Sequence, residues 1–364
     1  MSCLCPWMNV LRMCLISTSE GRLFFCMANH ALYIEYTSLK VMIILRKGTK
    51  DNYYYEDATG TRIKDKKVLE YLSGLRIPPA YRDVIIFYVK SPKILFQGYD
   101  DAGRLQQIYS PAHCKAACKK KFQSLIDFGH VLPKIYADCD RYIGSVRPTR
   151  NKVIAIIIKI ISLCYFRVGN AKYVKLYDHH GVSTITKSHI QKQKDGLHIK
   201  FVGKKGVVNE CTIKDAKLIT AIDSLLVNKK ISDPIFTYEE GGEKNAITAV
   251  EINNWLRQYG PEISTKMFRN FDSNVMFIEF MRNEHSAQDV APDKIALSKR
   301  KKALVAAMKE ISQEINNTPA ICKKAYMSPD LINLYLEHPR KFKTLFLKTG
   351  SARLAFISFL KGLA

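Results

Sequence analysis

The chain has 364 residues and carries 57 Lys and Arg against 33 Asp and Glu, which gives a formal charge of +24 at pH 7. An excess of this size is typical of proteins that bind polyanions, and it favours nucleic acid over a membrane surface because no amphipathic segment with a basic face stands out. The apolar content of 47% is high enough for two domains with hydrophobic cores and argues against a disordered chain.

The first 41 residues mix apolar residues with four of the ten cysteines and show no regular period. They lack the ordered basic, apolar and small-residue segments of a signal peptide. The longest apolar run, Val153–Phe166, is interrupted by Lys159 and is shorter than the roughly 20 residues that cross a bilayer, so we expect a buried helix there. The cysteines include no C-x-x-C pair, and we therefore expect reduced thiols in an intracellular protein, with no metal site and no cofactor.

Residues 42–113 have the pattern of a small β-rich domain. Short runs of β-branched and aromatic residues alternate with Pro, Gly and Asp, which are typical of turns. In D-D-A-G-R, Gly103 can adopt the positive φ that a hairpin turn requires. The predicted elements are a helix at Val68–Leu75 and strands at Val84–Val89, Ile94–Gly98 and Leu105–Tyr109.

Residues 114–364 are dominated by apolar residues at intervals of three and four, which is the period of helices. One stretch differs, because Gly196–Val208 alternates like a strand, turns at G-K-K-G and returns, which places Lys204 at a hairpin tip. The predicted fold class is therefore α+β, with a small β-rich N-terminal domain and a larger, mainly helical domain. The predicted helices are Cys114–Phe128, Leu132–Ile143, Lys152–Val168, Ile213–Leu226, Thr248–Tyr259, Asp293–Asn316 and Ser328–Leu336.

Three cations and one tyrosine in the helical region suit a phosphoryl-transfer site. Breaking a DNA strand without metal or nucleotide needs a nucleophile, groups that hold the charge of the transition state, and an acid for the leaving oxygen. Tyr326, in N-T-P-A-I-C-K-K-A-Y, suits the nucleophile. Arg167 in F-R-V-G-N and Arg269 in T-K-M-F-R-N-F suit the charge-holding role, and Lys204 in K-F-V-G-K suits the acid. Taken singly, such residues are more often a helix-end arginine, a solvated turn lysine and a core tyrosine.

Taken in their order along the chain, the four motifs resemble the catalytic set of the small type IB DNA topoisomerases of poxviruses, other large DNA viruses and bacteria. The resemblance covers about residues 42–364 and includes R-I-P-P-A-Y-R-D-V and Q-G-Y-D-D-A-G-R-L-Q-Q-I-Y, which look like their N-terminal DNA-clamping domain. It implies a C-shaped clamp around duplex DNA, and relaxation of supercoils through a transient 3′-phosphotyrosyl bond. It also indicates that Met42 is the start and residues 1–41 a translated upstream extension; a short structural extension is the alternative.

The resemblance also implies supporting and DNA-reading residues. Asn317 stands where poxvirus members have histidine, and its amide is expected to donate a hydrogen bond to a phosphate oxygen. Gln107 replaces a tyrosine that helps to read bases, and Lys205 replaces an acidic residue, so we do not carry over the poxvirus cleavage-site preference. The other residues implied are Lys266 and Asn274 as supports around the second arginine, and Arg104, Gln106, Gln107 and Tyr109 as DNA-binding residues.

Two other functions share parts of this pattern. A tyrosine recombinase has the same nucleophile, but its second arginine usually belongs to an H-x-x-R box, whereas Lys266 precedes Arg269 here. A catalytically inactive DNA-binding protein would not need Tyr326 beside a phosphate. We expect double-stranded DNA as the partner, a monomer, no small-molecule substrate and no membrane, and an intracellular, DNA-associated location such as the virion or viral factory of a large DNA virus.

Overall fold

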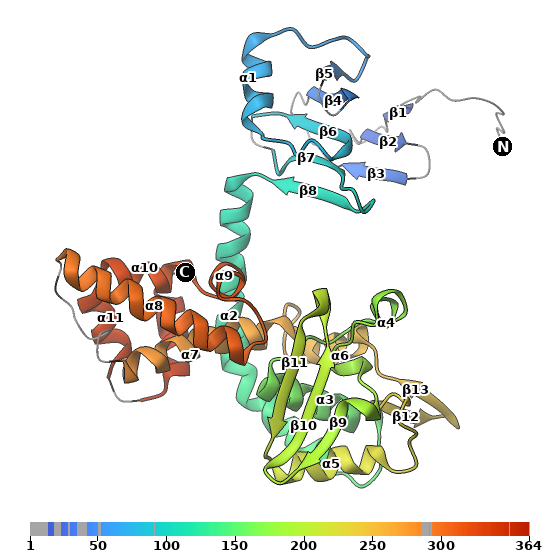
Figure 1. Ribbon diagram of the computed structural model, residues 1–364, viewed down its shortest axis with the longest axis vertical. Coiled ribbons are helices and arrows are strands. Elements are labelled where there is room, and N and C mark those ends of the chain that lie inside the picture. Colours follow the sequence, from blue (N-terminus) through green and yellow to red (C-terminus); the bar gives the residue numbers. More distant parts are fainter. Residues whose placement is uncertain are drawn as a thin grey trace. The chain divides into compact units, whose positions relative to one another are not determined.

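The computed structural model divides the chain into two compact units, residues 1–119 and 120–364. Strands β1 (Cys14–Ser17), β2 (Leu23–Met27) and β3 (His30–Ile34) form a small antiparallel sheet in the first unit. Most of the expected N-terminal extension lies outside the described residues, so its origin stays a prediction. The structure describes residues 14–17, 23–27 and 30–34 by their backbone, and residues 42–49, 52–90, 92–284, 291, 293–348 and 350–363 (Figure 1).

The main sheet of the first unit has five antiparallel strands in the order β5-β4-β6-β7-β8. Helix α1 (Lys66–Gly74) begins at Asp65, whose carboxylate accepts two backbone N–H groups of the first turn, and it packs Val68 and Leu72 against Phe96 and its neighbours in the sheet. The strands are β4 (Met42–Thr49), β5 (Asn52–Asp57), β6 (Arg82–Tyr88), β7 (Ile94–Tyr99) and β8 (Leu105–Tyr109).

Four predicted elements of this unit are confirmed close to their expected bounds, namely α1, β6, β7 and β8. The predicted hairpin turn between β7 and β8 is also present. Gly103 has a φ of 69°, and its N–H donates to the carbonyl oxygen of Asp100 over 2.9 Å. Strands β4 and β5 were not predicted.

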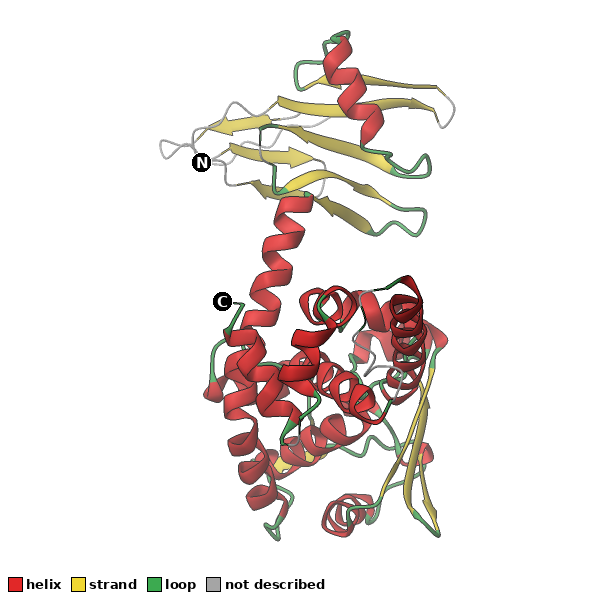
Figure 2. Cartoon of the chain, turned by 90° about the vertical axis from the view of Figure 1, so that its left-hand side faces the viewer, coloured by secondary structure: helices red, strands yellow, loops and turns green. Residues whose placement is uncertain are grey.

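The second unit is mainly helical, as predicted, and Figure 2 shows that helices make up most of it. It also holds a three-stranded sheet of β9 (Ile190–Gln193), β10 (Gly196–Val202) and β11 (Val208–Ile213), and a hairpin of β12 (Thr237–Glu240) and β13 (Glu243–Ala246). The helices are α2 (Pro111–Ile143, which begins in the first unit), α3 (Arg150–Cys164), α4 (Ala171–Tyr177), α5 (Ala216–Leu226), α6 (Ala249–Leu256), α7 (Lys266–Asn283), α8 (Lys294–Glu314), α9 (Pro319–Ala325), α10 (Pro329–Glu337), α11 (Pro339–Phe346) and α12 (Ala352–Lys361).

Helix α3 lies at the centre of this unit. Every residue from Val153 to Ile158 is fully buried, because the helix packs against α5, α6, α7 and strand β11. A helix that is apolar on all sides is stable only when it is surrounded, which confirms the buried helix expected from the long apolar run. It ends at Cys164 rather than at the predicted Val168, since Tyr165 takes a left-handed conformation.

The two helices predicted at Cys114–Phe128 and Leu132–Ile143 are one continuous helix, α2. Buried apolar residues continue at helical spacing through residues 129–131, which lie between the two predicted helices, and past Pro133. Gly129 has a packing role. A Cβ there would lie 2.6 Å from the Ile357 side chain and 2.9 Å from the Phe271 ring, so the glycine permits close contact with α12 and α7.

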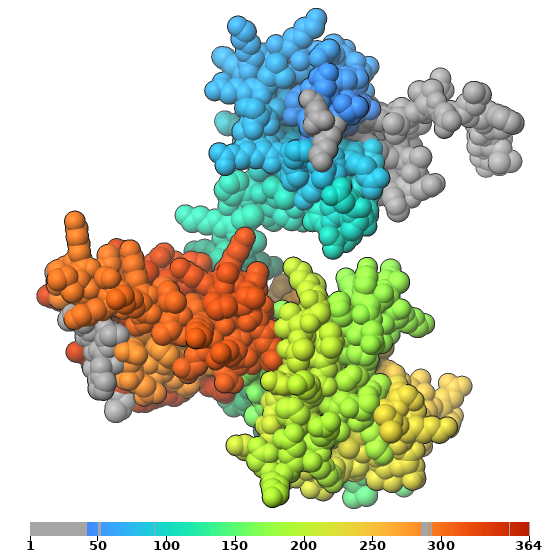
Figure 3. Space-filling view, in the orientation of Figure 1, coloured from blue at the N-terminus to red at the C-terminus, as the bar shows by residue number. Residues whose placement is uncertain are grey.

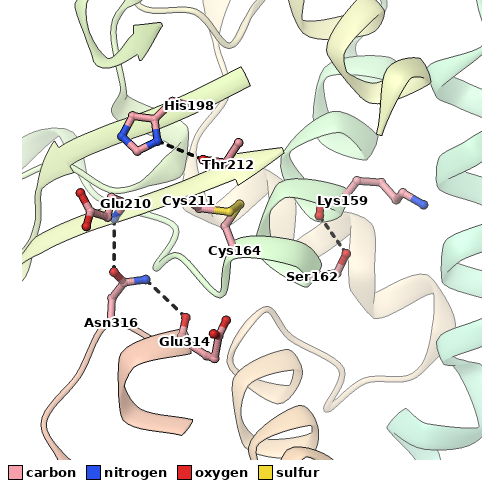
Figure 4. The surroundings of a disulfide bond; sticks show 9 residues. All are labelled: Lys159, Ser162, Cys164, His198, Glu210, Cys211, Thr212, Glu314 and Asn316. Atoms are coloured by element: carbon pink, nitrogen blue, oxygen red, sulfur yellow. Dashed lines mark hydrogen bonds between the residues drawn. A yellow bond between two sulfur atoms is a disulfide. The ribbon is translucent and has the colours of Figure 1, made fainter. Parts of the chain in front are cut away.

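The expectation that all cysteines are reduced is wrong for one pair. Cys164, the last residue of α3, forms a disulfide with Cys211 of β11 across a Cα–Cα distance of 5.6 Å (Figure 4). The two cysteines are 47 residues apart in the sequence and belong to no spacing motif. Only the packing of β11 against α3 brings them together.

Candidate active site

Arg167 follows the end of α3 through a left-handed turn. Tyr165 caps the helix with a φ of 54°, the ring of Phe166 is buried against β10, and Arg167 is left half-buried. Gly169, the glycine that follows, has a structural role, because it takes a φ of 101° and a Cβ on it would lie 2.9 Å from the Cα of Gly181. This close backbone crossing explains why F-R-V-G-N contains a glycine after the arginine.

Tyr326 lies at the end of α9, and its hydroxyl group meets two donors. Arg167 Nη2 and Asn317 Nδ2 each lie 3.3 Å from the hydroxyl oxygen. Helix α9 begins at Pro319, where Thr318 caps its first turn, and it ends at Ala325. Because the helix is short, Asn317 and Tyr326 flank its two ends. Two N–H groups that converge on one oxygen stabilise negative charge on it.

The backbone around Tyr326 is held from two helices. Asn274, fully buried in α7, donates from Nδ2 to the Tyr326 carbonyl oxygen over 3.0 Å and accepts the backbone N–H of Ser328 over 2.8 Å. Lys121 of α2 donates from Nζ to the carbonyl oxygen of Ala325 over 2.5 Å. The contacts of Asn274 fit its expected supporting role. The role of Lys121 was missed, because no sequence signal joins a lysine run to a segment so distant along the chain.

Arg269 is a buried cation on α7, only 3% exposed. Its guanidinium carbon lies 5.1 Å from the centre of the Tyr326 ring, and Nη2 donates to the carbonyl oxygen of Ile315. Within the described part of the chain, Nε and Nη1 have no hydrogen-bond partner. Burial lowers the pKa of Arg269 to about 10, which still leaves it charged at neutral pH. A buried cation with two unused donors is suited to receive an anion.

Lys204 lies in the loop between β10 and β11, as predicted. The loop is closed by a hydrogen bond from Gly203 N to Val207 O over 2.8 Å, and Lys205 takes a φ of 65°. Lys204 itself is exposed, and it lines a cavity of about 200 Å³ together with Arg167. In Figure 3 the yellow-green atoms of this hairpin lie beside the orange-red atoms of the C-terminal helices, where Tyr326 is found.

The structure therefore brings together Arg167, Arg269, Asn317 and Tyr326, and it places the lysine of the hairpin beside the first of them. Lys266 is different. It is exposed at the start of α7, and no hydrogen bond among the described residues joins it to Tyr326. Its expected support of the site stays a prediction.

Three of the expected DNA-reading residues, Gln106, Gln107 and Tyr109, lie on β8, the edge strand of the main sheet, and Arg104 directly precedes it. Arg104 forms an ion pair of 2.8 Å with Asp100, and Gln106 donates to the same carboxylate over 2.9 Å. Gln107 accepts a hydrogen bond of 3.1 Å from the hydroxyl of Tyr109. Successive residues of a strand face opposite sides of the sheet, so Gln106 lies on one face and Gln107 and Tyr109 lie on the other.

A family comparison decides the identity of the chain. Residues 113–343, more than half of its length, match the family described as "Eukaryotic DNA topoisomerase I, catalytic core". Residues 52–100 match "Bacterial DNA topoisomerase IB, N-terminal domain". The chain belongs to the type IB DNA topoisomerase family. It is therefore an enzyme, an isomerase that changes the topology of DNA, and DNA is its partner.

Named relatives of this topoisomerase come from large DNA viruses and from a fungus. It is 28% identical to "DNA topoisomerase 1B" of Acanthamoeba polyphaga mimivirus over 303 residues, which cover 82% of this chain and 88% of that protein. It is 24% identical to "DNA topoisomerase 1B" of Vaccinia virus (strain Copenhagen) over 276 residues, covering 74% of this chain and 82% of that protein. Identity to "DNA topoisomerase 1" of Mycosarcoma maydis is 26% over 176 residues, or 44% of this chain and 17% of that protein.

The topoisomerase has no described helix that is both long and apolar enough to cross a membrane.

Proposed function

We propose that Tyr326 is the nucleophile of this topoisomerase and forms a transient 3′-phosphotyrosyl bond with one DNA strand. The observation that carries the proposal is the convergence of Arg167, Asn317 and Arg269 on one tyrosine. A tyrosine placed only for packing would not need two donors at its hydroxyl oxygen and a buried guanidinium beside its ring. A phosphate requires such a setting, because negative charge accumulates on its oxygens as the tyrosine attacks.

The two arginines and Asn317 hold that charge. Two N–H groups of Arg269, Nε and Nη1, have no hydrogen-bond partner among the described residues. Arg167, which follows α3, donates from Nη2 to the Tyr326 hydroxyl. Donors fixed before the reaction need no reorganisation when the charge develops. Asn317 contributes a neutral amide, so its share of the stabilisation is smaller than that of a charged group.

Lys204 donates a proton to the departing 5′-oxygen. Its ammonium group is compact and mobile on an exposed loop, and the cavity that it shares with Arg167 gives it a path towards the phosphate. The intermediate keeps a phenolate leaving group, so the 5′-hydroxyl of the DNA can reverse the reaction and reseal the strand.

The finer features of partner and location follow from the same site. We propose a monomer as the active form. Gln106, Gln107 and Tyr109 of the edge strand β8, with Arg104 directly before it, are the residues that we assign to DNA contact in the first unit. The named viral relatives support an intracellular, DNA-associated location, with the virion or viral factory as the specific sites.

Capture of the covalent complex tests the nucleophile. Tyr326→Phe removes the attacking oxygen, so we expect no covalent adduct and no relaxation of supercoiled plasmid, while binding to duplex DNA changes by less than about threefold. Digestion of the wild-type adduct and mass spectrometry should place the DNA on the peptide that contains Tyr326. Relaxation by the Phe variant, or an adduct on another residue, would reject the assignment.

Tyr335→Phe is the matched control. Tyr335 is fully buried on α10, and its hydroxyl has no hydrogen-bond partner among the described residues, so its removal should be nearly neutral. This variant should form the adduct at the wild-type rate.

The same assay addresses the recombinase alternative. A wild-type adduct that formed only at paired specific sites would indicate a recombinase.

A further inference from the structure

The disulfide joins two segments that carry proposed catalytic side chains. Cys164 is the last residue of α3 and shortly precedes Arg167, and Cys211 lies on β11, the strand that leaves the loop of Lys204. The covalent bond therefore connects the arginine segment to the base of the lysine hairpin. Figure 4 shows the sulfur bridge between the helix end and the strand.

The same strand is tied to a third segment of the site. The backbone N–H of Glu210, next to Cys211, donates to Asn316 Oδ1 over 3.2 Å (Figure 4). Asn316 precedes Asn317, whose amide meets the Tyr326 hydroxyl. Strand β11 is therefore joined to α3 by the disulfide at Cys211 and to the turn after α8 by the hydrogen bond at Glu210. A shift of this strand would change the position of Lys204 relative to the nucleophile.

We propose that the Cys164–Cys211 disulfide is a redox-sensitive positioning device of the active site, which holds the Lys204 hairpin in place when oxidised and slows DNA cleavage when a dithiol reduces it. The proposal rests on the role of Lys204 proposed above. Disulfides that occur in reducing compartments are usually transient or redox-sensing, which is the behaviour expected of a bond between two catalytic segments.

The reduction balances with a dithiol as co-reactant. A thiolate of the dithiol attacks the sulfur of Cys211, which is only half-buried, and displaces the Cys164 thiolate. The second thiol of the reductant then displaces Cys211 and closes a cyclic disulfide. The protein gains two electrons and two protons as two cysteine thiols, and the reductant loses the same.

Other contacts should preserve the fold after reduction. The N–H of His180 donates to the Val202 carbonyl oxygen over 2.8 Å, and the rings of Phe166 and Phe201 pack with centroids 4.8 Å apart. These contacts hold β10 against the residues that follow α3 without a covalent bond. The loss of the disulfide is therefore expected to loosen the hairpin rather than to unfold the unit.

Single-turnover cleavage of an end-labelled duplex tests the proposal. We compare the full chain purified without reductant with the same protein after dithiothreitol, and alkylation with mass spectrometry reports the state of each cysteine. Reduction should slow wild-type cleavage about tenfold, because small displacements of a catalytic group are costly in rate. Cys211→Ala and Cys164→Ala should cleave slowly in both conditions and no longer respond to the reductant.

Cys118→Ser is the matched control, since Cys118 is a free cysteine on α2, and this variant should respond to dithiothreitol like the wild type. Free thiols at Cys164 and Cys211 after exposure to oxidised glutathione, or an unchanged cleavage rate after complete reduction, would overturn the proposal. So would an equal response in the variants that lack the disulfide.

A substrate with a 5′-bridging sulfur at the scissile bond separates positioning from stability. Sulfur leaves without a proton, so it should restore most of the rate lost on reduction if the Lys204 hairpin has moved. A general loss of structure would slow both substrates equally and would count against the proposal. Lys204→Ala in the same series tells the two hypotheses apart. If sulfur rescues this variant but reduction has no effect, the disulfide proposal fails alone; if sulfur does not rescue it, the role of Lys204 fails.

Discussion

Arg167 and Arg269 have the same side chain but different surroundings, and the difference determines what each contributes. Arg167 is half-buried and can follow the phosphate as DNA enters. Arg269 is buried and is held by a hydrogen bond to the Ile315 carbonyl oxygen, so its position is set before DNA arrives. Burial lowers the pKa of Arg269, which means that its charged form is poorly solvated. We expect an incoming phosphate to bind through charge attraction and to replace part of the solvation that the buried guanidinium has lost.

A lysine that acts as an acid differs from an arginine that holds charge, and a sulfur substrate reveals the difference. Lys204→Ala should slow cleavage of ordinary DNA about 100-fold or more and recover strongly when the 5′-bridging oxygen is replaced by sulfur. Arg167→Ala and Arg269→Ala should lose about 100- to 1000-fold on both substrates, because each removes a donor to the non-bridging oxygens. Single-turnover cleavage rates on matched duplexes provide the measurement.

Lys205→Ala is the control for this comparison. Lys205 is the adjacent residue of the same loop and carries the same charge. Lys205→Ala should therefore weaken DNA binding about as much as Lys204→Ala does, and the sulfur substrate should not increase its cleavage rate relative to the wild type. If sulfur rescued an arginine variant as well as the lysine variant, the roles of these residues would have to be exchanged or abandoned.

The residues of the candidate site could be proposed from the sequence, but their mutual arrangement could not. Tyr326 and the three cations each lie in a short motif, and their order along the chain carried the resemblance to a family. The contact of Lys121 with the nucleophile segment had no such signal, because it depends on how α2 packs beside α9. Asn274 was expected from the resemblance alone, and only the structure shows that it bonds to both sides of the Tyr326 peptide.

At the scale of elements, the hairpin of Lys204 was predictable and helix α7 was not. Strand alternation and a glycine-bounded turn are local patterns, so β10 and the loop could be placed from a few residues, whereas β11 lies almost wholly beyond the predicted stretch Gly196–Val208. Helix α7 carries Arg269 and Asn274 but has apolar residues on most of its circumference, as well as buried Asp272 and Ser273. Such a helix lacks the one-sided period by which amphipathic helices are found.

Asp272 gives helix α7 a dependence on pH. Its carboxylate is 2% exposed, has no hydrogen-bond partner among the described residues, and lies 3.5 Å from Arg353 of α12. Burial raises the pKa of Asp272 to about 7, and the nearby arginine offsets only part of this effect. The folded protein therefore binds this proton more tightly than the unfolded chain, so stability falls as pH rises from about 4 to about 7 and is level above that.

Asp272→Asn removes this titration while keeping the shape of the side chain. The variant should be more stable than the wild type at pH 8, by on the order of 2–4 kcal/mol, and the difference should shrink at pH 5. Urea unfolding of the two proteins at both pH values measures it. A wild type that is equally stable relative to the variant at pH 5 and pH 8 would show that Asp272 does not titrate in this range.

At the scale of the whole molecule, the net charge of the chain and its candidate site both concern DNA, but in different ways. The formal charge of +24 attracts DNA without regard to sequence, whereas the reaction as we propose it depends on a few donors in the second unit. We expect the phosphate contacts made through this general charge to determine affinity, and the contacts at Tyr326 to determine the cleavage rate. Variants in the two groups should therefore separate in binding and cleavage assays.

The donor set around Tyr326 makes a further prediction about cofactors. In the proposed mechanism, two guanidinium groups and an amide stabilise the phosphate charge that a divalent ion would otherwise stabilise, and Lys204 supplies the proton. The bond energy is conserved in the phosphotyrosyl ester, so rejoining needs no ATP.

We therefore expect single-turnover cleavage to change by less than about twofold after thorough treatment with EDTA and without nucleotide. Magnesium should affect only multiple-turnover relaxation, by weakening the hold of the charged protein on its product. A metal-dependent nuclease incubated with the same DNA verifies the chelation, and cleavage that stopped in EDTA and returned with magnesium would require a metal-based mechanism in place of this one.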